Sequence, residues 1–157
     1  MKRSIKMNDD ERAMMMLEKS IYEAKEMLEA KHIFRPFALI LDKEGSIRRV
    51  ENGIEDMQAS YMALHDEIMA HVQMRETADI IVLLTNASMP EQLAEEGVES
   101  SIRVHLEERS QQHKAIPSRY IYVPYQLQRL AGEEKVEARL FHPRAMSFHS
   151  EFFLKEE

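Results

Sequence analysis

Two side chains that can take part in chemistry, His105 and Glu107, lie two positions apart in the segment Ile102-Arg103-Val104-His105-Leu106-Glu107. Apolar and polar residues alternate in this segment. Because successive side chains of a strand point to opposite faces, His105 and Glu107 are predicted to share the polar face of one strand. Imidazole nitrogens and carboxylate oxygens are common zinc ligands. If His142 lies across the sheet from them, the three side chains form a metal site on an open sheet face.

A polar sheet face that binds nothing is the alternative to this metal site. A strand with one solvated face needs polar residues there in any case, and no spacing in the sequence requires His142 to meet His105. We favour the plain polar face. The sequence contains no Gly-x-Ser-x-Gly elbow, no glycine-rich phosphate loop and no cysteine, so we predict no cofactor and assign no catalytic residue.

The elements that must position these residues follow from hydrophobic spacing. Apolar residues recur at steps of three and four between 14 and 28, which predicts an amphipathic helix over 8–31 that begins with an Asn8 capping box. A second helix is predicted over 57–76. Between the two helices, strands at 37–41 and 46–50 flank the turn Asp42-Lys43-Glu44-Gly45 and form a hairpin. Further strands are predicted at 78–85, 102–107, 119–125 and 136–140.

The predicted order is therefore one helix, two strands, one helix and four strands, within a chain of 157 residues, the length of one domain. Neighbouring strands joined by short turns favour an antiparallel sheet. We expect a two-layer α+β domain over 8–143, in which two amphipathic helices pack on one side of an antiparallel sheet of about five to six strands. A C-terminal tail over 144–157 is expected to dock.

Methionine is concentrated on the two predicted helices, which carry eight of the twelve in the chain. Three of them are consecutive and cannot all face one sheet, and the tail adds three phenylalanines. Because methionine adapts to irregular apolar partners, this surface predicts a protein interface in a homodimer or with another protein. Contact between the helices of one subunit is the alternative. The predicted interface residues are Met15, Met16, Met27, Phe148, Phe152 and Phe153.

Charge and composition exclude several classes of partner. The formal net charge is -7, so binding to the phosphate backbone of a nucleic acid is not expected. The longest apolar runs, at 37–41 and 80–84, are too short to span a bilayer. The absence of cysteine agrees with a reducing cytoplasm. We expect a cytoplasmic protein without a membrane or nucleic-acid partner.

The segment from Phe34 to Arg48 combines an aromatic residue, Pro36-Phe37, an apolar strand, Asp42-x-x-Gly45 and a return strand. This pattern resembles a widespread group of small bacterial α+β proteins that have no assigned function. The segments 102–107 and Tyr122-Val123-Pro124-Tyr125 are similar to later landmarks of that group. The resemblance implies an α+β fold and supplies no catalytic residue.

From these patterns we expect a non-enzymatic protein-interaction or accessory domain that acts as a homo-oligomer. The alternative is a small hydrolase or metal-dependent enzyme with its site on the open sheet face.

Overall fold

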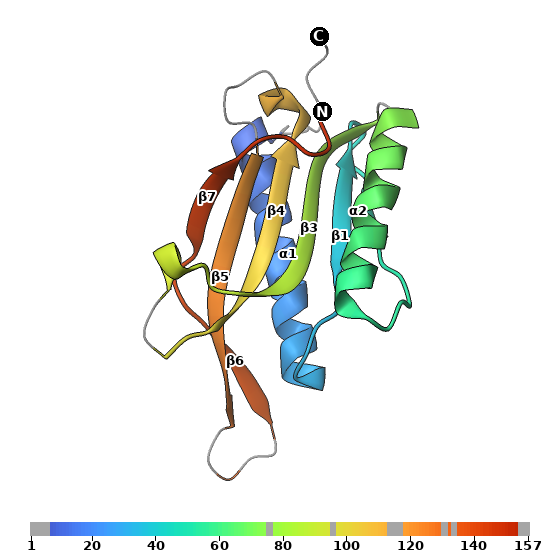
Figure 1. The fold of residues 1–157 in the computed structure, drawn as a ribbon. Coiled ribbons are helices and arrows are strands. Elements are labelled where there is room, and N and C mark those ends of the chain that lie inside the picture. Colours follow the sequence, from blue (N-terminus) through green and yellow to red (C-terminus); the bar gives the residue numbers. More distant parts are fainter. Residues whose placement is uncertain are drawn as a thin grey trace, which may run out of the picture.

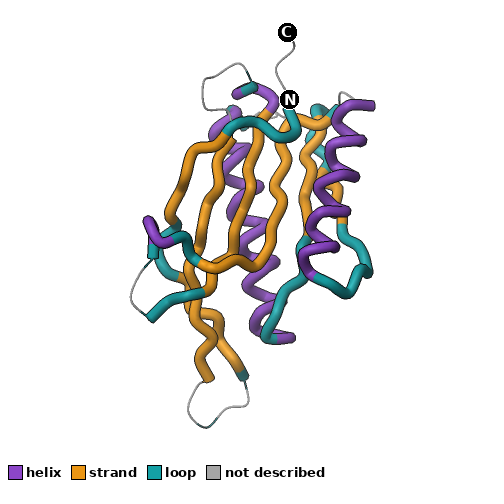
Figure 2. Tube along the Cα trace, viewed as in Figure 1, coloured by secondary structure: helices purple, strands orange, loops and turns teal. Residues whose placement is uncertain are grey.

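The computed structural model describes residues 7–74, 77–94, 97–112, 118–129, 132 and 135–153. These residues form an α+β fold in which two helices pack on an antiparallel sheet, as predicted (Figures 1 and 2). The elements are α1 (Asp9–Lys31), β1 (Phe37–Asp42), β2 (Ile47–Val50), α2 (Met57–Met74), β3 (Ala78–Ser88), β4 (Ser100–Glu108), β5 (Ser118–Arg129), β6 (Val136–Leu140) and β7 (Arg144–Phe148), with short 3-10 turns at Glu91–Leu93 and Arg109–Gln111.

Local sequence signals set the ends of the first elements. The Asn8 side chain accepts a hydrogen bond from the Glu11 N–H at 2.8 Å, and His32 ends α1 in a left-handed conformation, so the predicted helix over 8–31 is confirmed. The Asp42 carboxylate accepts two N–H groups of the turn between β1 and β2. Helix α2 begins at Met57 as predicted, and its predicted end near Glu76 lies outside the described residues.

The two helices lie on opposite faces of the sheet, which corrects the predicted two-layer arrangement. Alternate residues of β1 separate into two buried clusters: Leu39 and Leu41 pack with α1, and Ala38 and Ile40 pack with α2. Figure 1 shows α1 behind the sheet and α2 in front of it. The physical reason is that β1 and β3 are apolar on both sides, so each face needs its own cover. We call these faces the α1 face and the α2 face.

The described residues form a sheet of seven strands, in the order β2-β1-β3-β4-β5-β6, with β7 also paired to β5. Strands β6 and β7 lie end to end along β5, because 136–140 pair with 125–129 and 144–148 pair with 118–122. The expected tail over 144–157 therefore begins with a strand of the sheet. Residues 149–153 then turn back across the α2 face, and 154–157 lie outside the described residues. Neither of the two helices described is long and apolar enough to cross a bilayer.

Candidate functional site

The polar residues of β4 lie on the α2 face, beneath a covering segment. Ile102, Val104 and Leu106 belong to the core under α1, so the alternating residues point the other way. His105 is 0% exposed and Glu107 is 1% exposed. The predicted sharing of one strand face is confirmed, but the prediction that this face is open is wrong. Residues 151–153 cover it, since Phe152 and Phe153 pack into the cluster under α2.

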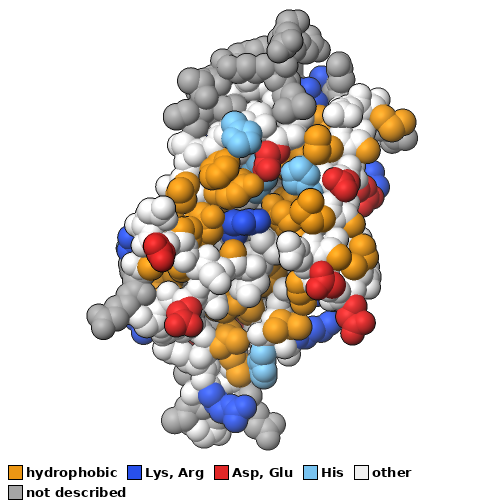
Figure 3. Space-filling view, viewed as in Figure 1, with side chains coloured by type: hydrophobic (Ala, Val, Ile, Leu, Met, Phe, Trp, Pro, Cys, Tyr) orange, Lys and Arg blue, Asp and Glu red, His pale blue; other side chains and the backbone are white. Residues whose placement is uncertain are grey.

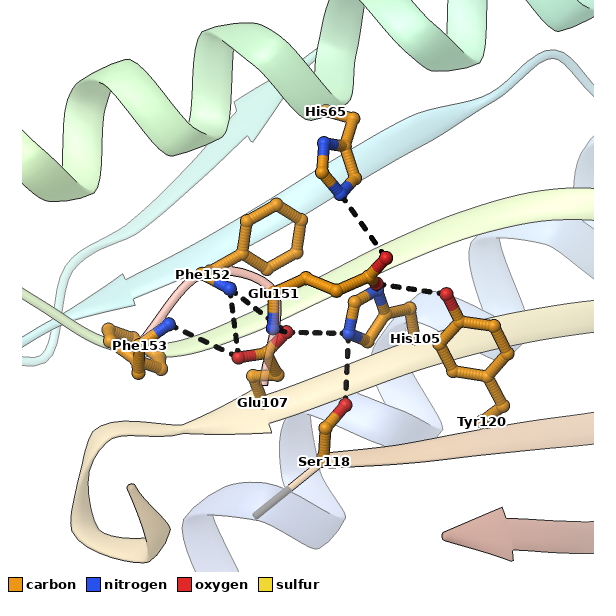
Figure 4. A network of polar contacts seen from close by, with 8 residues as sticks. All are labelled: His65, His105, Glu107, Ser118, Tyr120, Glu151, Phe152 and Phe153. Atoms are coloured by element: carbon orange, nitrogen blue, oxygen red, sulfur yellow. Dashed lines mark hydrogen bonds and ion pairs between the residues drawn. The ribbon is translucent and has the colours of Figure 1, made fainter. Parts of the chain in front are cut away.

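His105 lies between two carboxylates (Figure 4). Its Nε2 is 2.6 Å from Oε2 of Glu107 and 3.0 Å from Oγ of Ser118, the first residue of β5. On the other side of the ring, Nδ1 is 2.9 Å from Oε2 of Glu151. The imidazole thus connects β4 to the C-terminal segment. We call His105, Glu107 and Glu151 the buried triad, after its two buried members, since Glu151 itself is half-buried.

Glu107 holds the main chain of the C-terminal segment. Its carboxylate accepts the N–H groups of three consecutive residues: Glu151 at 2.9 Å, Phe152 at 3.1 Å and Phe153 at 3.2 Å. Consecutive N–H groups that converge in this way form an anion-binding concavity. Here the anion is a side chain of the same protein, so one buried carboxylate fixes the path of an irregular segment.

Glu151 brings the segment's own charge to the site. Tyr120 donates a hydrogen bond from its hydroxyl to Oε2 of Glu151 at 2.9 Å, and Nε2 of His65 on α2 is 3.6 Å from Oε1. The ring of Phe152 stacks on His105, with centroids 5.0 Å apart, and lies 4.8 Å from the ring of His65. The acid and the aromatic residue that follows it are therefore contacted from α2, β4 and β5 together.

The charged forms of His105 and Glu151 support each other. Burial lowers the pKa of His105, but hydrogen bonding and the charges of Glu107 and Glu151 outweigh burial, and the net result is a raised pKa. The imidazole lowers the pKa of Glu151 to about 2, against the opposing effect of burial. Burial raises the pKa of Tyr120, which keeps its hydroxyl a donor. The carboxyl groups that face both ring nitrogens thus favour the protonated form of His105.

The structure brings His105 and Glu107 together, as the metal hypothesis requires, but not His142. That histidine is exposed in the link between β6 and β7. Tyr120 is level with His105 and pairs with Met146, whereas His142 lies beyond the end of β7, where Arg144 pairs with Tyr122. Glu151 takes the third place, and the ligand atoms of His105, Glu107 and Glu151 all lie within 4.8 Å of one another.

The contacts within the buried triad fit an ion-pair network better than a metal ion. Two ligands of a tetrahedral zinc are roughly 3.3 Å apart, given its usual bond lengths, whereas Nε2 of His105 is 2.6 Å from Glu107. Both oxygens of Glu107 already accept main-chain N–H groups. Both imidazole nitrogens also face carboxylates at short range. This geometry favours a proton between each nitrogen and its carboxylate rather than a metal ion among them.

Ser118, His105 and Glu151 also lie in the order of a serine hydrolase triad, with the hydroxyl near Nε2 and a carboxylate near Nδ1. Three observations oppose that chemistry. Ser118 is 0% exposed. Glu107 competes with the hydroxyl for Nε2. Any opening that displaced residues 151–153 to admit a substrate would also remove Glu151. The arrangement does not support nucleophilic catalysis.

Three of the predicted interface residues are buried within the chain. Met16 is 0% exposed in the core under α1, and Phe152 and Phe153 are 3% and 2% exposed. These three are not available to a partner in this structure, because Met16 faces the core under α1 and the tail docks on its own sheet. Met15 and Met27 are half-buried against the same core as Met16. Phe148 is half-buried and stacks on Tyr120, with centroids 4.5 Å apart.

The surface beside the docked segment is aromatic and basic. The guanidinium of Arg103 lies 5.1 Å from the ring centre of Tyr61 on α2 and 5.0 Å from that of Tyr120 on β5. Figure 3 shows hydrophobic side chains gathered on this face, with basic and histidine side chains among them. Sequence reasoning missed Ser118, Tyr120 and Glu151. The one available signal was an acid followed by two phenylalanines beyond the last predicted strand.

Comparisons with protein-family models, with curated proteins and with solved structures found no match. The resemblance of residues 34–48 to the group of small bacterial proteins therefore stays a prediction.

Proposed function

We propose that this protein is a non-enzymatic interaction domain that acts as a homodimer, and that two copies pair through strand β7. The observation that supports this proposal is the contrast between the edges of the sheet. An unpaired edge offers a row of N–H and C=O groups to another chain, and proteins usually protect such edges with charges, short strands or covers.

Two edges have such protection. Strand β2 has four residues, two of which are the exposed arginines Arg48 and Arg49. On β6, the N–H of Ala138 donates to the carboxylate of Glu29 from α1, at 3.1 Å. Both features oppose the addition of a further strand.

Strand β7 is the outermost strand on its side of the sheet (Figure 1). Its central residues, Ala145, Met146 and Ser147, carry no charge. Among the described residues, their main chain has no hydrogen-bond partner other than β5. An antiparallel pair centred on Met146 would place Ala145 opposite Ser147 in both copies, which is the self-complementary contact of a two-fold dimer. The half-buried Phe148 would lie at the rim of that contact.

The burial of the polar cluster on β4 and β5 supports the non-enzymatic part of the proposal. The residues best suited to acid–base or nucleophilic chemistry in the described part of the chain, His105, Glu107 and Ser118, are all buried. The polar contacts of His105 and Glu107 hold residues 151–153 on the sheet.

Light scattering after size-exclusion chromatography tests the dimer. We expect the unmodified chain to be dimeric and the double variant Ala145→Lys/Ser147→Lys to be monomeric, because like charges directly opposite each other destabilise a strand pair. Ile47→Lys on the protected β2 edge is the matched control and should remain dimeric. A monomeric unmodified chain, or a dimeric double-lysine variant, would overturn the proposal.

A further inference from the structure

We propose that the groove between α2 and strands β3 and β4 is a peptide-binding site for an acidic residue followed by two aromatic residues. The chain's own Glu151-Phe152-Phe153 is then the resident occupant, and the partner is a segment of another protein with the same chemistry. This site is separate from the β7 edge. We call residues 151–153 the resident segment.

The resident segment is bound as a ligand would be. It contributes no strand to the sheet, and its three N–H groups go to the Glu107 side chain rather than to neighbouring main chain. Recognition of consecutive main-chain N–H groups does not depend on the side chains that the bound segment carries. Glu107 therefore supplies an anchor that any peptide with the same backbone path can use.

The two phenylalanines pack into the buried apolar cluster between α2 and the sheet. Leu64, Ile68 and Val72 line it from α2, and Ile81 and Leu83 line it from β3. Two cationic or aromatic side chains add contacts of defined geometry. The guanidinium of Arg109 lies 4.7 Å from the ring centre of Phe153, and His105 stacks on Phe152. Flat rings fill these positions better than aliphatic side chains.

The preceding position selects an acid. The carboxylate of Glu151 meets Nδ1 of His105 and the hydroxyl of Tyr120, each at 2.9 Å, and Nε2 of His65 at 3.6 Å. Two of these groups come from the sheet and one from α2, so none of the three belongs to the resident segment. An uncharged side chain at this position would forgo the contact with the imidazolium.

The resident segment is attached to β7 through only His149 and Ser150, so it competes with a partner peptide for the same site. Such a tether gives the resident segment a local concentration on the order of millimolar. A free peptide is therefore expected to bind weakly to the unmodified chain and strongly only when the resident segment is impaired.

Titration with synthetic peptides tests the site. The receptor is the full chain carrying Phe152→Ala/Phe153→Ala, and the probe is a peptide with the sequence of residues 147–157. We expect saturable binding with one peptide per receptor. Replacing the glutamate at the position of Glu151 by glutamine should weaken binding at least about tenfold, and replacing both phenylalanines by alanine should abolish it. The unmodified chain should bind the parent peptide at least about tenfold more weakly than the receptor does.

Circular dichroism shows whether the receptor is folded. If it is not, Glu151→Gln is the receptor, because it keeps both phenylalanines and weakens only the acid contact. No binding to a folded receptor, or equal binding of all three peptides, would overturn the proposal. The second copy is tested with Ala145→Lys/Ser147→Lys in both chains, which removes the β7 contact. A heterodimer between the receptor and a chain that keeps the resident segment would then identify a second copy as the occupant and overturn the assignment to another protein. Failure of the peptide site leaves the β7 dimer proposal standing, since the peptide variants change only residues 151–153 and not the edge of β7.

Discussion

Strand β4 presents Ile102, Val104 and Leu106 to α1, and Arg103, His105 and Glu107 to the opposite face. The α1 face is covered by one long helix whose buried contacts are nearly all apolar. The α2 face is covered jointly by α2 and the resident segment, and its centre is the buried triad. Apolar burial is nondirectional and insensitive to pH, whereas the buried triad requires specific atoms and protonation states.

This difference assigns different roles to the two faces. We infer that the α1 face stabilises the fold as a whole, and that the α2 face adds a local, chemically selective attachment for a short segment. The following predictions test that division, beginning with the largest expected effect.

Glu107→Ala should have the largest effect. It removes the acceptor of three N–H groups and leaves His105 buried without its closest carboxylate, and breaking a buried ion pair lowers the free energy of unfolding by about 3–5 kcal/mol. Urea denaturation followed by circular dichroism measures the change. Glu137→Ala, at an exposed position on β6, is the matched control and should change stability by about 0.5 kcal/mol or less. A loss for Glu107→Ala no larger than that of the control would contradict the role of the buried triad.

Leu84→Ala on the α1 face should lower the free energy of unfolding by about 2–5 kcal/mol, because Leu84 is fully buried. Its loss should be the same at every pH at which the protein folds. Hydrogen exchange should show the resident segment still docked until the whole domain unfolds. Selective release of the resident segment in this variant would contradict the division between the faces.

Docking of the resident segment should weaken at both high and low pH. The pKa of His105 is raised above its usual 6.5, so its contribution is complete below 6.5 and is lost as pH rises through the raised value. The pKa of Glu151 is lowered from 4.5 to about 2, so its contribution is present above 4.5 and is lost as pH falls towards 2. Fluorine NMR of fluorinated Phe152 and Phe153 would follow docking across this range, with His105→Gln as the control whose alkaline limb should vanish.

Tyr120→Phe should have the smallest effect, because it removes one hydrogen bond to the partly exposed carboxylate of Glu151. We expect a loss of about 1 kcal/mol in the free energy of docking, measured by hydrogen exchange of the resident segment. Tyr22→Phe on the exposed side of α1 is the matched control and should be neutral. Equal effects of the two changes would remove Tyr120 from the recognition of the acid.

Patterns of residues close together in sequence were sufficient to predict the helices and strands. They did not predict which segment packs on which face of the sheet. The Asn8 cap, the turn at Asp42–Gly45 and the alternation that puts His105 beside Glu107 all depend on residues close together in sequence. The contact of Glu107 with the main chain of Glu151 spans 44 positions. A period of two marks a polar face without showing whether water or another segment covers it. The same limit explains why both helices were predicted on one face.

The most direct test of the central claim is amide hydrogen exchange at residues 151–153 in the unmodified chain and in Glu107→Gln. The claim is that one buried carboxylate holds the resident segment by its main chain. It predicts protected amides in the unmodified chain, and in the variant a loss of protection confined to the resident segment while β4 and β5 keep theirs. Amides at 151–153 that exchange freely in the unmodified chain, or that stay equally protected in Glu107→Gln, would contradict it.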